Sequence, residues 1–119
     1  MKQDELFGTT QAGEAVPRFT IRGGGLRACI LGWGAVVQDL RLDGHDAPLV
    51  LGFDRFGPYE ADGGYFGALV GRFANRIRGG RFALAGRHHQ TDRNFLGRHT
   101  LHGGAAGYAR RLWEVSLHG

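Results

Sequence analysis

Two arginines and an asparagine lie among apolar residues in the stretch 71–77, where no neighbouring acidic residue balances the two positive charges. No acidic residue occurs between Asp62 and Asp92 to balance Arg72 and Arg76. Charged groups beside apolar residues need partners, because an unpaired buried charge is very costly. We therefore expect these guanidinium groups to meet either carboxylates from elsewhere in the fold or a polyhydroxylated ligand.

His102 is the histidine whose surroundings indicate binding or acid–base chemistry. It precedes Gly103, Gly104 and Gly107, where a missing side chain lets another group approach the backbone closely. An imidazole in such a loop can donate a hydrogen bond to a ligand oxygen or act as a general acid or base. A structural turn histidine is the alternative, and the spacing alone does not choose between them.

The remaining histidines and the cysteine give no metal signature. His99 and His102 have the spacing of a metal-binding pair, but no third ligand has a clear placement. His88 and His89 are adjacent in a predicted strand, so their rings point to opposite faces. The single Cys29 excludes an intrachain disulfide and a multi-cysteine metal site. We therefore expect exposed or hydrogen-bonded imidazoles in preference to a metal site.

The carboxylates and aromatic residues narrow the chemistry further. No pair among the eleven acidic residues has a spacing that specifies paired acid and base catalysis. Trp33, Tyr65 and Trp113 are candidate sugar-stacking surfaces, although core packing is the preferred interpretation for most of them. The residues alone predict a polar binding site built from Asn75, Arg76 and His102.

Composition limits the classes of protein to which the chain can belong. Its 119 residues form at most one small domain or a piece of a larger one, and 42% apolar content is typical of a globular chain. The net charge is +4, and fourteen of the fifteen basic residues are arginines that are dispersed along the sequence. Dispersed arginines favour a coding bias over a nucleic-acid-binding patch. No apolar run approaches transmembrane length, so we expect a cytoplasmic protein without nucleic-acid or membrane partners.

Short apolar runs bounded by turn residues predict an all-β fold. Residues 53–64 and 93–100 are predicted as loops, and the run at 65–70 is too short to choose between helix and strand. A hairpin at 81–91 should turn at Gly86-Arg87. The predicted strands are an edge strand at Leu6-Phe7 and runs at 16–21, 26–31, 35–42, 48–52, 81–85, 88–91 and 112–117.

The sequence resembles the aldose 1-epimerase (galactose mutarotase) family along nearly its whole length. Residues 67–77, followed at this distance by Leu101-His102-Gly103-Gly104, are the most specific part of the resemblance. The other matching positions are 32–35, 50–54, Tyr59, 65–66, 80–82, Asn94, Gly107, Tyr108 and Trp113.

The resemblance implies an antiparallel β-supersandwich that interconverts the α and β anomers of hexoses such as galactose and glucose, without a cofactor. In the family a glutamate base takes the proton from the anomeric hydroxyl while a histidine acid protonates the ring oxygen. The ring opens, the C1–C2 bond rotates, and the ring closes on the other face. Asn75, Arg76 and His102 match family positions that hydrogen-bond sugar hydroxyls, a task that suits a planar guanidinium.

One departure from the family limits the expected activity. The catalytic histidine and glutamate of the family lie at positions downstream of those matched here, so none of the catalytic residues is expected in this chain. The resemblance therefore implies that residues 1–119 are the N-terminal part of a single aldose 1-epimerase domain, truncated and inactive alone. A non-catalytic carbohydrate-binding relative that keeps Arg76 and His102 is the alternative. A small arginine-rich nucleic-acid-binding protein is a third, which the dispersed arginines disfavour.

Overall fold

The fold is seen in a computed structural model that describes residues 3–62, 64–116 and 118. The chain divides into two compact units. We call residues 1–69 with 112–119 the sheet unit, and residues 70–111 the loop unit. Among the described residues, no helix is long and apolar enough to cross a lipid bilayer.

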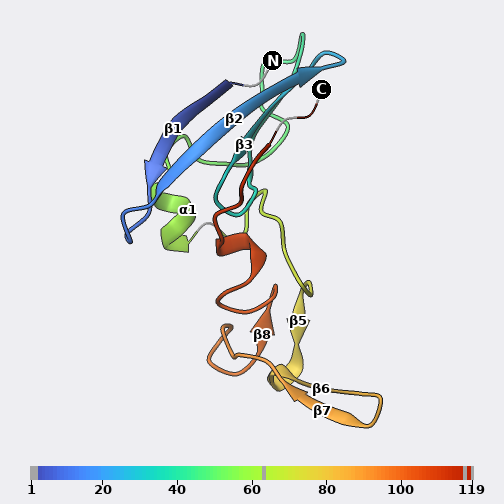
Figure 1. The fold of residues 1–119 in the computed structure, drawn as a ribbon. Helices are drawn as coiled ribbons and strands as arrows, with labels where there is room; N and C mark the ends of the chain where they lie inside the picture. The colour runs from blue at the N-terminus through green and yellow to red at the C-terminus, as the bar shows by residue number, and fades with distance from the viewer. Residues whose placement is uncertain (1–2, 63, 117, 119) are drawn as a thin grey trace. The chain divides into compact units, whose positions relative to one another are not determined.

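A four-stranded antiparallel sheet forms the sheet unit, with the strands in sequence order (Figure 1). The predicted strands at 16–21 and 26–31 are confirmed, and they meet at a two-residue turn, Gly24-Gly25, with φ of 58° and 81°. Two successive positive φ angles match the twist of a tight hairpin, which explains the glycines there. The strands are β1 Gln3–Thr9, β2 Ala15–Gly23, β3 Leu26–Leu31 and β4 Val37–Leu42.

The core of the sheet unit lies between the strands and helix α1, Gly57–Asp62. Trp33 is 7% exposed and packs edge-to-face on Phe56, with ring centroids 5.3 Å apart. Tyr59 of α1 is also buried, and its hydroxyl accepts a hydrogen bond from the Phe53 backbone N–H at 2.9 Å. The buried core cluster consists of Val16, Leu31, Trp33, Val36, Phe56 and Tyr59.

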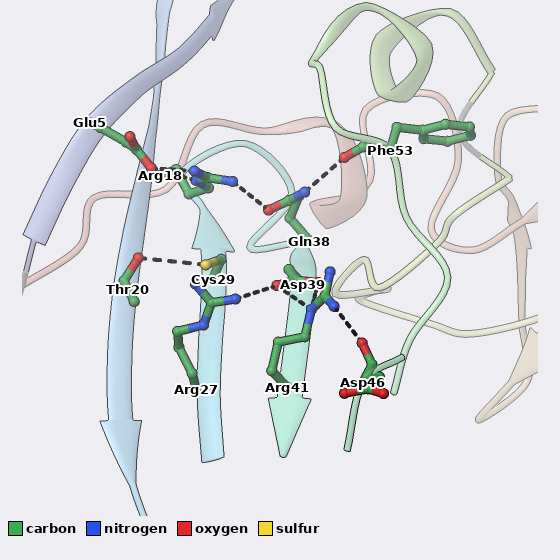
Figure 2. A network of polar contacts seen from close by, with 10 residues as sticks. All are labelled: Glu5, Arg18, Thr20, Arg27, Cys29, Gln38, Asp39, Arg41, Asp46 and Phe53. Atoms are coloured by element: carbon green, nitrogen blue, oxygen red, sulfur yellow. Dashed lines mark hydrogen bonds and ion pairs between the residues drawn. The ribbon is translucent and has the colours of Figure 1, made fainter. Parts of the chain in front are cut away.

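A polar network covers one face of this sheet (Figure 2). A β-bulge places Gln38 opposite no partner, because Cys29 pairs with Asp39 whereas Ile30 pairs with Val37. Gln38 is 8% exposed, accepts a hydrogen bond from Arg18 at 3.0 Å, and donates one to a backbone carbonyl at 2.8 Å. In a regular strand, Gln38 and Asp39 would point to opposite faces of the sheet. The bulge lets both side chains join the polar network on one face.

Several predicted elements of the sheet unit are wrong or incomplete. Residues 48–52 form bends and not a buried strand, and Leu51 is 75% exposed. The predicted loop at 53–64 contains α1. The run at 65–70 is neither helix nor strand: residues 65–67 lie in a turn, in which Tyr65 has φ of 62°, and residues 68–70 are irregular. Of the predicted strand at 112–117, only Leu112 pairs, as an isolated bridge to Trp33. Leu117 lies outside the described residues.

The loop unit contains two small antiparallel ladders, β5 with β8 and β6 with β7 (Figure 1). The hairpin predicted at 81–91 is confirmed, but its turn is Ala85-Gly86, with φ of 50° and 75°. All ladders of the described residues are antiparallel, which confirms the all-β class. The elements are β5 Arg76–Ile77, η1 Arg78–Gly80, β6 Arg81–Leu84, β7 Arg87–Gln90, β8 Thr100–Leu101 and η2 Tyr108–Arg110.

Candidate functional site

The three residues predicted as a binding site lie together at one end of the β5–β8 ladder. Arg76 of β5 pairs with Leu101 of β8, so Asn75 and His102 are the next residues outward. The Asn75 N–H donates to Nδ1 of His102 at 3.0 Å, and the His102 N–H donates to the Asn75 carbonyl at 3.0 Å. This reciprocal pair joins two segments that are 27 residues apart in the sequence.

Both ends of this pair have backbone conformations that are uncommon for residues with a side chain. The φ angle of Asn75 is 62° and that of His102 is 48°. Positive φ is found in a few per cent of non-glycine residues, with asparagine and histidine enriched among them. Such conformations cluster at functional sites, where the surrounding structure holds them in place.

The hydrogen bond to Nδ1 decides the donor properties of His102. Because Nδ1 accepts the Asn75 N–H, the neutral ring carries its hydrogen on Nε2. His102 is therefore both a turn residue that secures the loop and a side chain whose Nε2 is a hydrogen-bond donor. The two interpretations that the sequence left open are compatible with one another.

The exposed guanidinium of Arg76 is oriented by an aromatic ring and an amide oxygen. Its Cζ lies 4.6 Å from the centroid of the Phe95 ring, within the range of cation–π attraction. Its Nη1 donates to Oδ1 of Asn75 at 3.1 Å. Phe95 was not recognised from the sequence, where its only signal was an aromatic residue in a predicted polar loop.

The glycines after His102 accommodate close approaches, as their spacing predicts. A methyl group on Gly103 would overlap the carbonyl of Gly71, and one on Gly104 would overlap the Asp92 carboxylate. A Cβ on Gly107 would lie 2.7 Å from the carbonyl oxygen of His102 itself. The approaching groups belong to the protein, so these glycines allow the loop to close around His102.

Asn94 secures the other side of β8. Its Nδ2 donates to the Leu101 carbonyl at 2.9 Å, and the Leu101 N–H donates to its Oδ1 at 2.8 Å. The amide thereby extends the β5–β8 ladder in place of a third strand. Leu101, the residue before His102, is thus paired with Arg76 on one side and with Asn94 on the other.

Aromatic rings lie against Arg72 and Arg76, the two arginines for which carboxylates were one of the expected partners. The Cζ atoms of Arg72 and Arg111 lie 5.5 Å and 5.4 Å from the centroid of the Tyr108 ring. The ion pairs among the described residues include neither Arg72 nor Arg76. Of the two alternatives for Arg72 and Arg76, a carboxylate partner is not found among the described residues.

The candidate stacking aromatics all belong to the sheet unit. Trp33 packs in its core, as the preferred interpretation holds. The Trp113 backbone N–H donates to the Gly32 carbonyl at 2.6 Å, and Tyr65 is half-buried. These three residues are not part of the cluster around His102.

Neither a set of three metal ligands nor a carboxylate base belongs to this cluster among the described residues. His99 uses Nδ1 to accept the Gly79 N–H at 3.0 Å, and no group of three or more His, Cys, Asp or Glu residues suited to a metal occurs among the described residues. Asp92 is the single acidic residue of the loop unit, and its Oδ2 accepts the Ala105 N–H at 2.7 Å. The arrangement can therefore donate hydrogen bonds to a neutral polar ligand and orient it.

Known proteins resemble the chain in sequence. A family model described as aldose 1-epimerase matches residues 17–119. A galactose mutarotase of Bos taurus is 38% identical over 112 residues, covering 91% of this chain and 32% of that protein. One of Rattus norvegicus is 38% identical over 116 residues, covering 94% of this chain and 34% of that protein. The chain spans about a third of the length of these relatives.

Solved structures resemble the chain in fold. An aldose epimerase homologue of C. elegans aligns with a TM-score of 0.69 and 32% identity, covering 100% of this chain and 33% of that one. A galactose 1-epimerase of Lactobacillus acidophilus aligns with a TM-score of 0.78 at 23% identity, covering 96% of this chain and 33% of that one. The second likeness concerns the fold alone. Together with the antiparallel ladders, these alignments confirm the β-sandwich class of fold.

Proposed function

The chain belongs to the aldose 1-epimerase family, and on this premise we propose that Asn75, Arg76 and His102 bind the hydroxyl groups of an aldohexose such as galactose. The observation that carries the proposal is the reciprocal hydrogen-bonded pair of Asn75 and His102 beside the oriented guanidinium of Arg76. Relatives named galactose mutarotases match over this part of the chain.

The donors of the cluster suit a polyhydroxylated ring. A guanidinium presents up to five N–H donors in a rigid plane, and Phe95 and Asn75 hold that of Arg76 in one orientation. The Nε2–H of His102 adds a further donor. Neighbouring hydroxyls of a pyranose are neutral acceptors that these N–H donors can reach as a set.

The proposed reaction of the whole protein is the interconversion of α and β anomers. Ring opening needs a base at the anomeric hydroxyl and an acid at the ring oxygen. The only carboxylate of the loop unit, that of Asp92, already accepts a hydrogen bond from Ala105, and the chain spans about a third of the length of its mutarotase relatives. We therefore propose that the acid and base lie outside this chain, and that residues 1–119 are the N-terminal part of a single domain.

Calorimetry with galactose tests the binding role. We expect saturable binding to the 119-residue chain, and a dissociation constant at least about tenfold higher in Arg76→Ala, because hydrogen bonds from a charged group are lost. Arg87→Ala is the matched control, because Arg87 is exposed in β7 and carries the same charge. Equal binding by both variants would contradict the assignment.

Polarimetry tests the catalytic part of the proposal. The chain alone should not raise the anomerisation rate of galactose above that of the buffer. Mutarotation that is lost on Arg76→Ala would show that the acid and base are within residues 1–119. A fusion to the remaining two-thirds of the bovine relative separates a mutarotase from a non-catalytic sugar-binding relative. Turnover by the fusion supports the first, and binding without turnover supports the second.

The cellular location and the partners of the protein are also part of the proposed function. We place it in the cytoplasm, acting on a free aldohexose without a nucleic-acid or membrane partner, as the composition of the sequence leads us to expect. Fractionation of cells that produce the tagged chain checks this part. Recovery in the membrane or nucleoid fraction would contradict it.

A further inference from the structure

The loop unit contains a pocket of about 490 Å³ that is lined by four arginines, two glycines and a histidine. Its volume is within the range of small-molecule sites. Its residues come from η1, from the start of β6 and from the loop before β8 (Figure 1). The lining residues are Arg78, Gly79, Arg81, Arg93, Gly97, Arg98 and His99.

Backbone contacts hold the two walls of this pocket together. The Gly79 N–H donates to Nδ1 of His99 at 3.0 Å, which joins η1 to the loop. In the loop, the Phe95 N–H donates to the His99 carbonyl at 2.9 Å, and the His99 N–H donates to the Phe95 carbonyl at 3.0 Å. This tight turn carries Arg98 at its end. These hydrogen bonds order the backbone segments from which Arg78 and Arg98 project.

No carboxylate neutralises the arginines of this pocket. The loop unit has nine arginines and one acidic residue, Asp92, a formal net charge of +8. The Asp92 carboxylate accepts the Ala105 N–H and lies against Gly104. The ion pairs of the described residues all belong to the sheet unit. The four arginines that line the pocket therefore give it a positive potential that attracts anions.

The protein contacts of these arginines leave most of their donors available. Arg93 donates from Nε to the Gly79 carbonyl and from Nη2 to Gln90, both at 3.4 Å. Since Nδ1 of His99 accepts a backbone hydrogen bond, its neutral ring carries the hydrogen on Nε2 and is also a donor. A pocket with five donor side chains and no acidic one is suited to a multiply charged oxyanion.

We propose that this pocket binds a phosphate dianion, either free or as a phosphomonoester, through Arg78, Arg81, Arg93 and Arg98. Planar guanidinium groups match the geometry of phosphate oxygens and bind them with paired hydrogen bonds. The pocket is distinct in its residues from the Asn75–Arg76–His102 cluster. It therefore predicts an anion ligand in addition to the neutral sugar.

Titration calorimetry with inorganic phosphate and with glycerol 2-phosphate tests the pocket on the 119-residue chain, at low ionic strength and pH 7.5. We expect saturable binding that weakens with added salt, and a dissociation constant about tenfold higher in Arg81→Gln and in Arg98→Gln. Arg87→Gln removes an equal charge from the same hairpin outside the pocket, and should bind within about twofold of the original chain.

A second measurement separates loss of the site from loss of the fold. Phosphate should raise the unfolding temperature of the original chain and of Arg87→Gln, but not that of Arg98→Gln. Far-ultraviolet circular dichroism establishes that the variants fold alike. Tighter binding of glycerol 2-phosphate than of inorganic phosphate identifies a phosphomonoester as the ligand, and equal binding identifies free phosphate.

Three results would overturn the proposal. One is the absence of saturable phosphate binding to the folded chain. Another is equal weakening in Arg87→Gln, which would show that diffuse charge and not the pocket attracts the anion. The last is a short DNA duplex that displaces phosphate with a steep salt dependence, which would identify a polyanion-binding surface instead.

Discussion

The two units of the chain differ most in which groups their arginines contact. The sheet unit has six basic and ten acidic residues, a formal net charge of −4, whereas the loop unit has nine arginines and one aspartate. Arg18 pairs with Glu5, and Arg27 and Arg41 both pair with Asp39 (Figure 2). In the loop unit three arginines lie over the rings of Phe95 and Tyr108.

This difference separates structural arginines from arginines that can bind a ligand. A guanidinium bonded to a carboxylate has used donors and charge within the protein. One that lies over a ring keeps its N–H groups in the plane, where an external acceptor can reach them. For Arg72 and Arg76 the sequence allowed either carboxylate partners within the protein or a ligand. The described residues provide aromatic rings and not carboxylates.

The largest expected effect concerns the backbone packing of the loop unit. Gly103→Ala places a methyl group against the Gly71 carbonyl at a residue with φ of 87°. We expect a loss of about 4 kcal/mol in the free energy of unfolding, from the combined clash and left-handed conformation. Chemical denaturation measures it. Gly86→Ala is the control, because its φ is 75° but nothing lies within 4 Å. An equal loss of unfolding free energy in Gly86→Ala would show that the positive φ, and not the clash with Gly71, causes the destabilisation.

The next effect tests the hydrophobic core of the sheet unit. Leu31→Ala should lower the free energy of unfolding by about 3 kcal/mol, because Leu31 is 0% exposed and its removal leaves a cavity. Leu6→Ala is the matched control on β1, where the leucine is 69% exposed. Amide hydrogen exchange should show the loss of protection in β2 and β3. Similar losses in the two variants would contradict the assignment of the core.

A smaller effect tests whether side-chain amides replace strands in the loop unit. Asn94→Ala removes both hydrogen bonds with Leu101 and should cost about 2 kcal/mol of unfolding free energy. Asn94→Asp keeps the acceptor for the Leu101 N–H but not the donor, so an intermediate loss is expected. Thermal unfolding of the original chain, Asn94→Asp and Asn94→Ala measures the order of their stabilities. If Asn94→Ala unfolds like the original chain, Asn94 is not a support of β8.

The smallest effect concerns Tyr59 and depends on pH. Burial raises the pKa of Tyr59 above its ordinary value of 10.0, and the nearby Asp39 charge raises it further, while the hydrogen bond from Phe53 acts in the opposite direction. The neutral phenol is thus favoured in the folded state, so its contribution is complete below about pH 10 and is lost as the pH rises through the folded pKa.

Comparison with Tyr59→Phe isolates this contribution. The variant should lose about 1 kcal/mol at pH 8, because the Phe53 N–H loses its acceptor. Above pH 10 the unfolding free energy of the original chain should fall more steeply than that of the variant. Denaturant titrations from pH 8 to 11 provide the measurement. Parallel pH profiles would show that Tyr59 does not titrate differently in the folded state.

Local signals explain what the sequence predicted well. The strands β2 and β3 and the β6–β7 hairpin follow from alternation and from glycines in turns, which act between neighbours in the chain. The glycines at 103 and 104 predicted a close approach to the backbone, although the approaching groups, Gly71 and Asp92, are distant in the sequence. The prediction of a strand at 48–52 was wrong, because so short an apolar run shows no periodicity. Whether such a run pairs depends on the strands that lie beside it.

The sequence by itself determined the antiparallel β class, the family and the residue types available for binding. Only the tertiary structure decided that Asn75 and His102 exchange two hydrogen bonds, that Phe95 orients Arg76, and that Arg98 faces a pocket with arginines of η1 and β6. These contacts join residues that are distant along the chain. Their formation depends on ladder register and loop closure, which no local pattern encodes.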